Sequence, residues 1–484
     1  MAIRSLNRIF IVGYLFAVGC RGEREISNPS ADRTFRSPPT ALDRYVATPD
    51  ASYTWKTVNS TSIGDTRITL IDMTSQTWLT TNEVNRTHWR HWLTVFHPKE
   101  ATSSTALLFI SGGGNTDTKP PKPSNELIQV ALASKSVVVE LKMVPNQPLI
   151  FGNDGKERVE DDLIAYTWDK FLRTGDERWP ARLPMTKSAV RAMDTVTAYT
   201  ASPQGGGNAI TTFVVAGGSK RGWTTWTTAA VDKRVIGICP IVIDLLNIEN
   251  SFRHHFSAYG FYAPAVGNYV EQGIMDWQGT PEYRALMKIE EPFEYRDRLT
   301  LPKLMLNACG DQFFLPDSSQ FYFDRLNGPK FLRYVPNTDH SMRNSDAYQT
   351  LAVWHHALIN KTPLPRFSWT WDNSESIRVT VKDTPKTVKL WKATNPKTRD
   401  FRLETLGPVW TSTDLRPNDS GDFTGTVSKP SDGWTAYMVE LSFDVGGPMP
   451  LKLTTPVRVT PTNLPHAAPV IRGLKKGFLS GAQN

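Results

Sequence analysis

The sequence has 484 residues, of which 39% are apolar and 21% are charged, and this composition argues against extended disorder. A chain of this length usually forms more than one hydrophobic core, so two domains are expected. The formal net charge is +8 at pH 7, but basic and acidic residues are interspersed and no zinc-finger or RNA-binding signature accompanies them, so nucleic-acid binding is not expected.

The first twenty residues have the pattern of an export signal. Arg4 and Arg8 precede an apolar run over residues 9–18, which is too short to cross the ~30 Å hydrocarbon core of a bilayer as a helix. The run ends in Gly-Cys and resembles a bacterial lipobox, in which the cysteine, here Cys20, is lipidated. We therefore expect residues 1–20 to be a lipoprotein-type signal. The lipid would anchor an exported protein to the outer membrane, facing an aqueous compartment; an ordinary signal would leave it periplasmic or secreted.

The middle of the chain changes from alternating to continuous apolar runs. Residues 21–45 are polar and are expected to form a flexible tether, and alternation from residue 66 onward predicts paired antiparallel strands. Short apolar runs then alternate with helical patterns; the runs are 106–110, 137–141, 212–216, 235–243, 303–308 and 331–335. Strands of this kind predict a mostly parallel sheet with helices on both faces. Residues 46–362 are thus expected to form an α/β domain.

Two further regions are set apart by composition. Residues 247–298 form an insert rich in aromatic side chains, which predicts a cap over a site at the strand ends, although the same aromatics could fill the core of the cap. Past Pro363 and Pro365, short alternating strands predict a separate β-sandwich over residues 366–461 that contributes no catalytic group. Residues 462–484 are expected to form a tail.

A turn of small residues follows the run that ends at Ala216. Its sequence is Gly-Gly-Ser-Lys-Arg-Gly, with Ser219 at the third place. Hydrolase sheets carry their nucleophile on such a strand-to-helix turn, where small neighbours are needed because the backbone is strained. The match to G-x-S-x-G is imperfect because the second glycine comes one place late. It is closer to the G-x-S-[RK]-x-G turn of glucuronoyl esterases, so Ser219 is the candidate nucleophile.

Candidate partners for this serine lie after two later strands. Asp311 follows an apolar strand in a Gly-Asp pair, and His340 lies in the loop after the next strand. The order Ser, Asp, His is the one that α/β-hydrolases use, with the histidine as base and the aspartate orienting it. Asp317 is the alternative acid, and Asp339, next to the histidine, is a weaker alternative.

Acyl transfer also needs hydrogen-bond donors for the developing oxyanion. The amide of Lys220 is one candidate because it opens the helix after Ser219. The other is expected from Gly113 and Gly114, in a Gly-rich loop that resembles the oxyanion loop of lipases and esterases. A phosphate-binding loop is excluded because no Gly-Lys-Ser/Thr follows these glycines. The Lys220 side chain could also lend its charge, as the arginine at the matching place does in glucuronoyl esterases.

No metal or cofactor site is expected. The adjacent histidine pairs at 254–255 and 355–356 have no carboxylates at ligand spacing. Cys239 and Cys309 lie in apolar strand-like runs, where cysteine packs as a small apolar residue, so buried free thiols are expected rather than a disulfide.

Three segments together resemble the PhoPQ-activated pathogenicity-related proteins. They are residues 217–224, 307–317 and 434–440, and the resemblance extends over about residues 54–461. It implies an α/β-hydrolase core. The family is described as virulence-related, is controlled by a two-component regulator that senses low magnesium and cationic peptides, and is linked to antimicrobial-peptide resistance. This resemblance does not define a substrate.

Two classes of function follow. The first is a serine hydrolase that cleaves an ester or amide of a small molecule or peptide at the cell envelope. The second is a non-catalytic protein that binds a peptide or an envelope component through the cap and sandwich. The presence of Ser219, Asp311 and His340 favours the enzyme, because a binding protein does not need them. The pattern gives no oligomeric state.

Overall fold

The computed structural model describes residues 38–116, 119–471 and 477–479. The expected signal, Cys20 and most of the expected tether lie outside these ranges. From Pro39 onward the chain forms one compact unit. Of the helices within the described ranges, none combines the length and apolar composition needed to cross a membrane.

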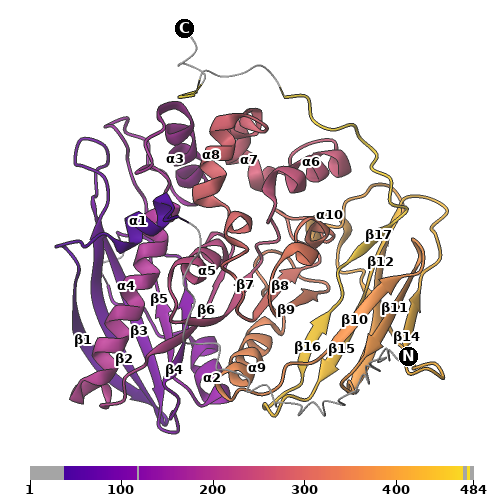
Figure 1. The fold of residues 1–484 in the computed structure, drawn as a ribbon, viewed down its shortest axis with the longest axis horizontal. Coiled ribbons are helices and arrows are strands. Elements are labelled where there is room, and N and C mark those ends of the chain that lie inside the picture. The colour runs from indigo at the N-terminus through magenta and orange to yellow at the C-terminus, as the bar shows by residue number, and fades with distance from the viewer. Residues whose placement is uncertain (1–37, 117–118, 472–476, 480–484) are drawn as a thin grey trace, which may run out of the picture. The chain divides into compact units, whose positions relative to one another are not determined.

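Within the described residues, a fourteen-stranded sheet forms the centre of the fold, and Figure 1 shows its arrangement. Its strands in spatial order are β1 (Thr54–Ile63), β2 (Thr66–Thr77), β3 (His88–Pro98), β5 (Val138–Leu141), β4 (Thr105–Ile110), β6 (Thr212–Gly218), β7 (Val235–Ile241), β8 (Lys303–Ala308), β9 (Lys330–Val335), β16 (Leu451–Thr454), β15 (Trp434–Phe443), β12 (Thr387–Asn395) and β13 (Thr411–Asp414), with β17 (Arg458–Thr460) paired to β15. The pairs from β5 to β9 are parallel, whereas β1, β2 and β3 are antiparallel. The expected α/β class is confirmed.

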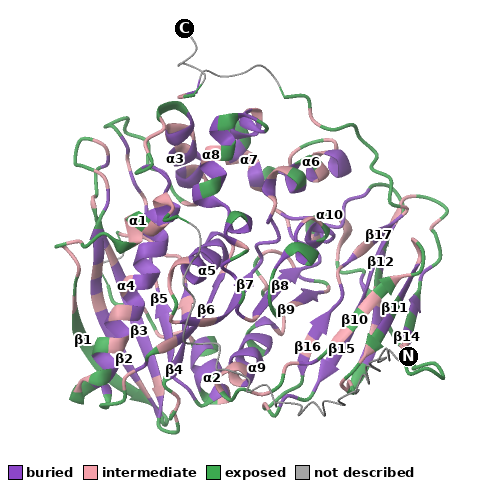
Figure 2. Cartoon of the chain, in the orientation of Figure 1, coloured by how far each residue is buried: buried purple, intermediate pink, exposed green. Residues whose placement is uncertain are grey.

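The central strands are apolar throughout because both of their faces are covered. In β4, Leu107 packs into one buried cluster and its neighbour Leu108 into the other, and Val214 and Val215 of β6 divide in the same way. Successive side chains of a strand point to opposite faces, so a strand covered on both sides reads as a continuous apolar run. Figure 2 shows this burial through the central strands and the exposed residues along β1.

Helices form a layer on each face of the sheet. One face is covered by α2 (Asn125–Ser134) and α9 (Ala347–Ile359), whose apolar residues share a cluster. The other cluster contains residues of α1 (Ala41–Ala47), α3 (Glu160–Thr174), α4 (Arg182–Ala201) and α5 (Lys220–Val231). This arrangement leaves the ends of the parallel strands free to carry a site.

The aromatic insert is helical. It contains α6 (Ile248–Tyr259), α7 (Gly267–Glu271) and α8 (Pro281–Glu290), of which α7 and α8 lie beside α3 in Figure 1. Its aromatic residues have different surroundings. Trp277 is buried in the core, Phe261 is 45% exposed, and Phe252 and Tyr269 line a cavity that also contains Ser219.

The C-terminal strands form two layers, but one layer continues the central sheet. A small sheet of β10 (Phe367–Trp371), β11 (Ser376–Val381) and β14 (Phe423–Thr426) packs on β12 and β15, with Gly425 close to Leu390 and Val439. On the other side, β16 pairs with β9 through Thr454 and Leu332. The boundary expected near residue 366 therefore falls within one continuous sheet, and independent folding of 366–461 stays a prediction.

The two cysteines in the described part of the chain are free and buried, as expected. Cys239 lies in β7 and Cys309 directly follows β8. Burial raises the pKa of the Cys239 thiol above its usual range. These thiols are therefore packing groups in this fold rather than reactive ones.

Candidate active site

Ser219 occupies a strained turn between β6 and α5. Its backbone has φ 58° and ψ −127°, a region that residues with a side chain rarely adopt. The turn is held by a hydrogen bond of 2.8 Å from the Ser219 amide to the Ile241 carbonyl of β7. Such strain at the end of a central strand presents the hydroxyl above the sheet, as in the nucleophile turn of hydrolases.

The glycines around Ser219 are required by close backbone contacts. A Cβ on Gly217 would lie 2.9 Å from the Arg221 carbonyl oxygen, and one on Gly222 would lie 2.8 Å from the Gly217 carbonyl oxygen. The two glycines therefore pack the strand end against the first turn of α5. This contact explains why the second glycine of the motif stands one place later than in G-x-S-x-G.

Asp311 and His340 are bonded to each other. His340 Nδ1 lies 2.8 Å from one carboxylate oxygen of Asp311 and 3.0 Å from the other. Asp311 is 3% exposed and also accepts the amides of Phe313 and Phe314. A proton on Nδ1 donates to this carboxylate, which leaves Nε2 as an acceptor. The His340 amide donates to the Gln312 side chain at 3.0 Å, which fixes the loop.

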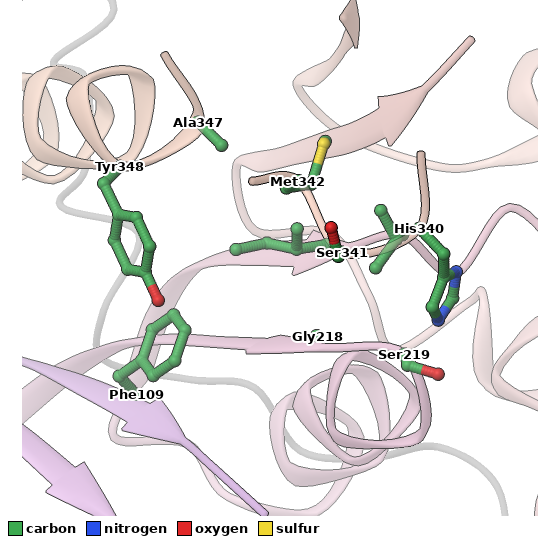
Figure 3. Close-up of a pocket in the computed structure, with 10 residues that line it drawn as sticks. Phe109, Gly218, Ser219, His340, Ser341, Met342, Ala347 and Tyr348 are labelled. Carbon is green, nitrogen blue, oxygen red and sulfur yellow. The ribbon is translucent and has the colours of Figure 1, made fainter. Parts of the chain in front are cut away.

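Ser219 and His340 share a cavity of about 160 Å³. Figure 3 shows the two side chains at one end of the cavity, with Phe109 and Tyr348 at the other end. Among the hydrogen bonds of the described residues, none joins Ser219 Oγ to His340. Catalytic hydrogen bonds are often long in the absence of substrate, so the arrangement is compatible with proton transfer.

The two alternative acids have other partners. The Asp317 carboxylate is paired with Arg399 at 2.6 Å and with His254 at 3.1 Å. Burial by itself would raise the pKa of Asp317, but the charges and hydrogen bonds of these two residues hold it well below the usual range. Asp339 accepts hydrogen bonds from Ser341 and Gln312. Of the three aspartates, Asp311 is the one that contacts His340.

The expected oxyanion residues lie in two places. Lys220 is the first residue of α5, directly after Ser219. Gly113 lines a different cavity, together with Trp92 and Lys142. The loop nevertheless reaches the nucleophile turn, since a Cβ on Gly112 would lie 2.6 Å from the Arg221 guanidinium. The donor roles of Lys220, Gly113 and Gly114 stay predictions.

An ion cluster beside Ser219 was not foreseen. Lys220 Nζ lies 2.7 Å from Glu160 and 3.2 Å from Asp161, and Arg221 lies 2.6 Å from Glu160. Burial acts to raise the pKa of Glu160, but the hydrogen bond from Arg221 and the two positive charges hold it well below its usual range. The Lys220 charge is therefore balanced by two carboxylates rather than free. The sequence shows the basic pair Lys220 and Arg221 directly after the serine, but it does not predict that acidic residues of α3 pair with them.

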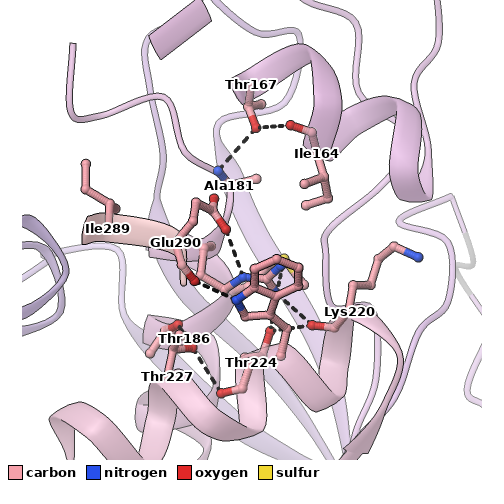
Figure 4. Close-up of polar contacts among 12 residues, drawn as sticks. Ile164, Thr167, Ala181, Thr186, Lys220, Thr224, Thr227, Ile289 and Glu290 are labelled. Carbon is pink, nitrogen blue, oxygen red and sulfur yellow. Dashed lines mark hydrogen bonds and ion pairs between the residues drawn. The ribbon is translucent and has the colours of Figure 1, made fainter. Parts of the chain in front are cut away.

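A buried pair anchors the start of α5 to α4 and α8. Arg182, 1% exposed, donates to the Lys220 carbonyl at 2.6 Å and pairs with Glu290 at 3.2 Å. Trp223 of α5 donates to the Glu290 carbonyl. Figure 4 shows the polar contacts around Glu290, Lys220 and Thr224. Because these groups are buried and hydrogen-bonded, they fix the helix that carries the nucleophile turn.

Asp244 is a further buried carboxyl group, and the sequence did not predict it. It is 2% exposed and accepts hydrogen bonds from Tyr322 at 2.5 Å and Tyr334 at 2.6 Å. Burial raises the pKa of Asp244 to about 7, against the opposing effect of the two tyrosine hydroxyls.

In the described ranges, no group of three or more His, Cys, Asp and Glu side chains comes together as metal ligands would.

The C-terminal segment supports both loops of the site through residues that lie between its strands. The Leu403 amide donates to the carbonyl of Gly310, the residue before Asp311, at 3.0 Å. Asn337, three residues before His340, exchanges two hydrogen bonds of 2.9 Å with the Trp410 backbone. The C-terminal segment thus contacts the backbone that positions the acid and the base.

Comparison with known proteins agrees with this picture. Residues 42–402 match the model of the PhoPQ-activated pathogenicity-related protein family. A protein of Dictyostelium discoideum, autocrine proliferation repressor protein A, is 38% identical over 458 residues, which cover 89% of this chain and 92% of that protein.

Solved esterases resemble the chain at low identity. Acetyl xylan esterase 1 from Thermoanaerobacterium sp. JW/SL YS485 is 13% identical, with a TM-score of 0.46, over 66% of this chain and 92% of that one. A glucuronoyl esterase from Solibacter usitatus is also 13% identical, with a TM-score of 0.37, over 66% of this chain and 91% of that one. The parallel strands at the centre of the sheet, with helices on both faces, are those of an α/β-hydrolase fold.

Proposed function

Because the chain belongs to the PhoPQ-activated pathogenicity-related protein family, we propose that it is a serine hydrolase that cleaves an ester or amide bond. In this proposal Ser219 is the nucleophile, His340 the base and Asp311 the acid. The observation that carries it is the bond between His340 and Asp311, which leaves the other ring nitrogen free in the cavity that Ser219 lines. A protein that only binds a ligand has no use for a serine on a strained turn beside such a histidine.

The reaction would proceed through an acyl-enzyme. His340 Nε2 takes the proton of Ser219 as Oγ attacks the carbonyl carbon, and Asp311 stabilises the imidazolium that forms. The same proton passes to the leaving alcohol or amine as its bond to the acyl carbon breaks. A water then attacks the acyl group with His340 again as base, which releases the acid and restores Ser219. The amide of Lys220 and the 112–114 loop would donate to the oxyanion.

The proposed location is the cell envelope, with Cys20 acylated. It is supported by the export-signal pattern, and the family's description as pathogenicity-related supports a role in virulence. Resistance to antimicrobial peptides is the form of that role that we propose. Mass spectrometry of the mature N-terminus tests the anchor. An unmodified N-terminus downstream of Cys20 would replace the lipoprotein by a secreted protein.

The similarity to an autocrine proliferation repressor favours a second candidate, an extracellular protein that acts by binding. The match covers 92% of that protein, so it is not confined to the hydrolase motifs. The two candidates differ in their need for Ser219. If Ser219→Ala retains the biological effect of the wild type, whether peptide resistance or growth repression, the binding role is the better account.

Turnover of a simple activated ester tests the enzyme directly. Wild type should hydrolyse phenyl acetate, and Ser219→Ala should not. Ser75→Ala is a matched control, because Ser75 Oγ also lies 3.0 Å from a histidine, His91 Nε2, but is fully buried. Equal rates for wild type and Ser219→Ala would contradict the proposal.

A further inference from the structure

Ser219 stands between two cavities of very different size. The first, of about 160 Å³, is the one it shares with His340. The second, of about 20 Å³, lies on the side of the cap and is lined by Lys220, Trp168, Trp223 and Tyr269 as well as Ser219. An ester bound for attack by Ser219 has two parts, the acyl group and the alcohol. Two cavities that meet at the nucleophile therefore offer one place for each.

The direction of proton transfer assigns the parts. In the proposed mechanism, His340 returns its proton to the leaving oxygen, so the alcohol must lie on the side of the imidazole. In the proposed mechanism the carbonyl oxygen points to the amide of Lys220, and Lys220 is one of the residues that line the small cavity. The acyl substituent then extends into the small cavity, and the alcohol occupies the large one.

The size of the small cavity limits the acyl group. A volume of about 10–15 Å³ on this measure holds one water molecule, so about 20 Å³ has room for a methyl group and little more. Its walls belong to the core. Trp168 packs edge-on against Trp223 at 5.9 Å between ring centres and lies 5.4 Å from Tyr269, while Phe252 is 3% exposed. Side chains in a close-packed interior resist displacement, so these walls would not move to admit an acyl group longer than acetyl.

The large cavity has a different character. An apolar cavity of about 150 Å³ accepts a benzene molecule, so a volume of about 160 Å³ suits one aromatic ring. Phe109, Val242, Met342 and Tyr348 supply apolar walls, and the rings of Phe109 and Tyr348 lie 5.8 Å apart at the end away from Ser219 (Figure 3). Among the residues that the structure describes, no lysine, arginine, aspartate or glutamate lines it. A charged alcohol would gain no carboxylate, lysine or arginine partner from these walls.

We propose that the site takes the acetyl ester of a compact, uncharged aromatic alcohol. This inference rests on the proposed serine-hydrolase function and adds its substrate class. The group transferred to Ser219 Oγ is acetyl, the alcohol leaves with the proton held by His340, and water then releases acetate.

A series of phenyl esters tests the acyl assignment. Wild type should hydrolyse phenyl acetate with a kcat/KM at least about tenfold above that for phenyl butyrate, since each methylene that does not fit costs about that much. Val266→Ala enlarges the small cavity and should narrow this ratio by about tenfold. Phe252→Ala should act in the same direction. Because each ratio is measured within one protein sample, a lower yield of folded variant does not change it.

Tyr348→Ala is the matched control in the other cavity. It should lower the ratio of kcat/KM for phenyl acetate to kcat/KM for methyl acetate. The ratio of kcat/KM for phenyl acetate to that for phenyl butyrate should stay unchanged. If wild type hydrolyses phenyl octanoate as well as phenyl acetate through Ser219, the substrate class is overturned while the hydrolase function stands. If no ester is hydrolysed in a Ser219-dependent way, the proposed function itself fails.

Discussion

The guanidinium of Arg399, in the C-terminal part of the chain, lies 2.6 Å from the carboxylate of Asp317, six residues beyond Asp311. The Arg399 and Asp317 side chains are 3% and 4% exposed. Loss of Arg399 would leave the buried Asp317 carboxylate with His254 as its remaining partner, and removing one partner of a buried ion pair costs about 3–5 kcal/mol. We therefore expect Arg399→Ala to lower the free energy of unfolding in urea by this amount. Arg366→Ala, in an exposed pair with Asp383, should leave the free energy of unfolding almost unchanged. Equal effects would contradict a structural role for the buried pair.

Removal of the C-terminal strands tests whether they are a separate domain. A chain that ends at residue 365 loses the partner of β9 and the Leu403 and Trp410 contacts to the acid and base loops. Exposed β9 would become an unpaired edge, so we expect an insoluble protein or one without ester hydrolysis. A soluble truncated protein with wild-type turnover would show instead that residues 366–461 form an independent sandwich.

The sequence could predict Asp311 and His340 because each follows an apolar strand in the order that the fold uses. Their pairing needs only that adjacent parallel strands end at one edge, and β8 and β9 are adjacent. Glu160 could not be predicted as the partner of Lys220, because it lies on α3 and its position depends on how α3 packs against α5. The same holds for Asp244, whose tyrosine partners come from later elements.

The sequence also could not predict that the C-terminal strands continue the central sheet through the pairing of β16 with β9. Alternation in β15 and β16 predicts strands, but it does not say which edge they join. The pairing of β16 with β9 is accompanied by long-range contacts such as the buried ion pair of Arg333 with Glu440. Such contacts carry no local signal in a single sequence.

Asp311 and Asp317 should respond differently to replacement by asparagine. Asp311→Asn removes the charge that orients His340 and should reduce kcat for phenyl acetate by about 10⁴-fold, with little change in unfolding. Asp317→Asn should act mainly on stability, because its partners are Arg399 and His254. Measurement of kcat and of urea unfolding for both variants separates the two effects. The reverse pattern would make Asp317 the catalytic acid.

Asp244 should make stability depend on pH. Burial raises its pKa to about 7, so between its unfolded value near 4 and about 7 the folded state binds a proton that the unfolded state has lost. The contribution is therefore fully present below about pH 4 and is lost as the pH rises through about 7. In Asp244→Asn, the fall in melting temperature from pH 5 to pH 8 should be smaller than in wild type. An unchanged slope would show that the carboxyl group is ionised throughout this range.

The central claim is that Ser219 is an activated nucleophile, and covalent labelling by a fluorophosphonate tests it most directly. The probe reacts with serines that a neighbouring base activates, and mass spectrometry of the digested protein locates the adduct. The account predicts one adduct, on Ser219, which is absent in Ser219→Ala, strongly reduced in His340→Ala and unchanged in Ser75→Ala. Folded wild-type protein that carries no adduct on Ser219, or equal labelling of Ser219→Ala, would contradict it.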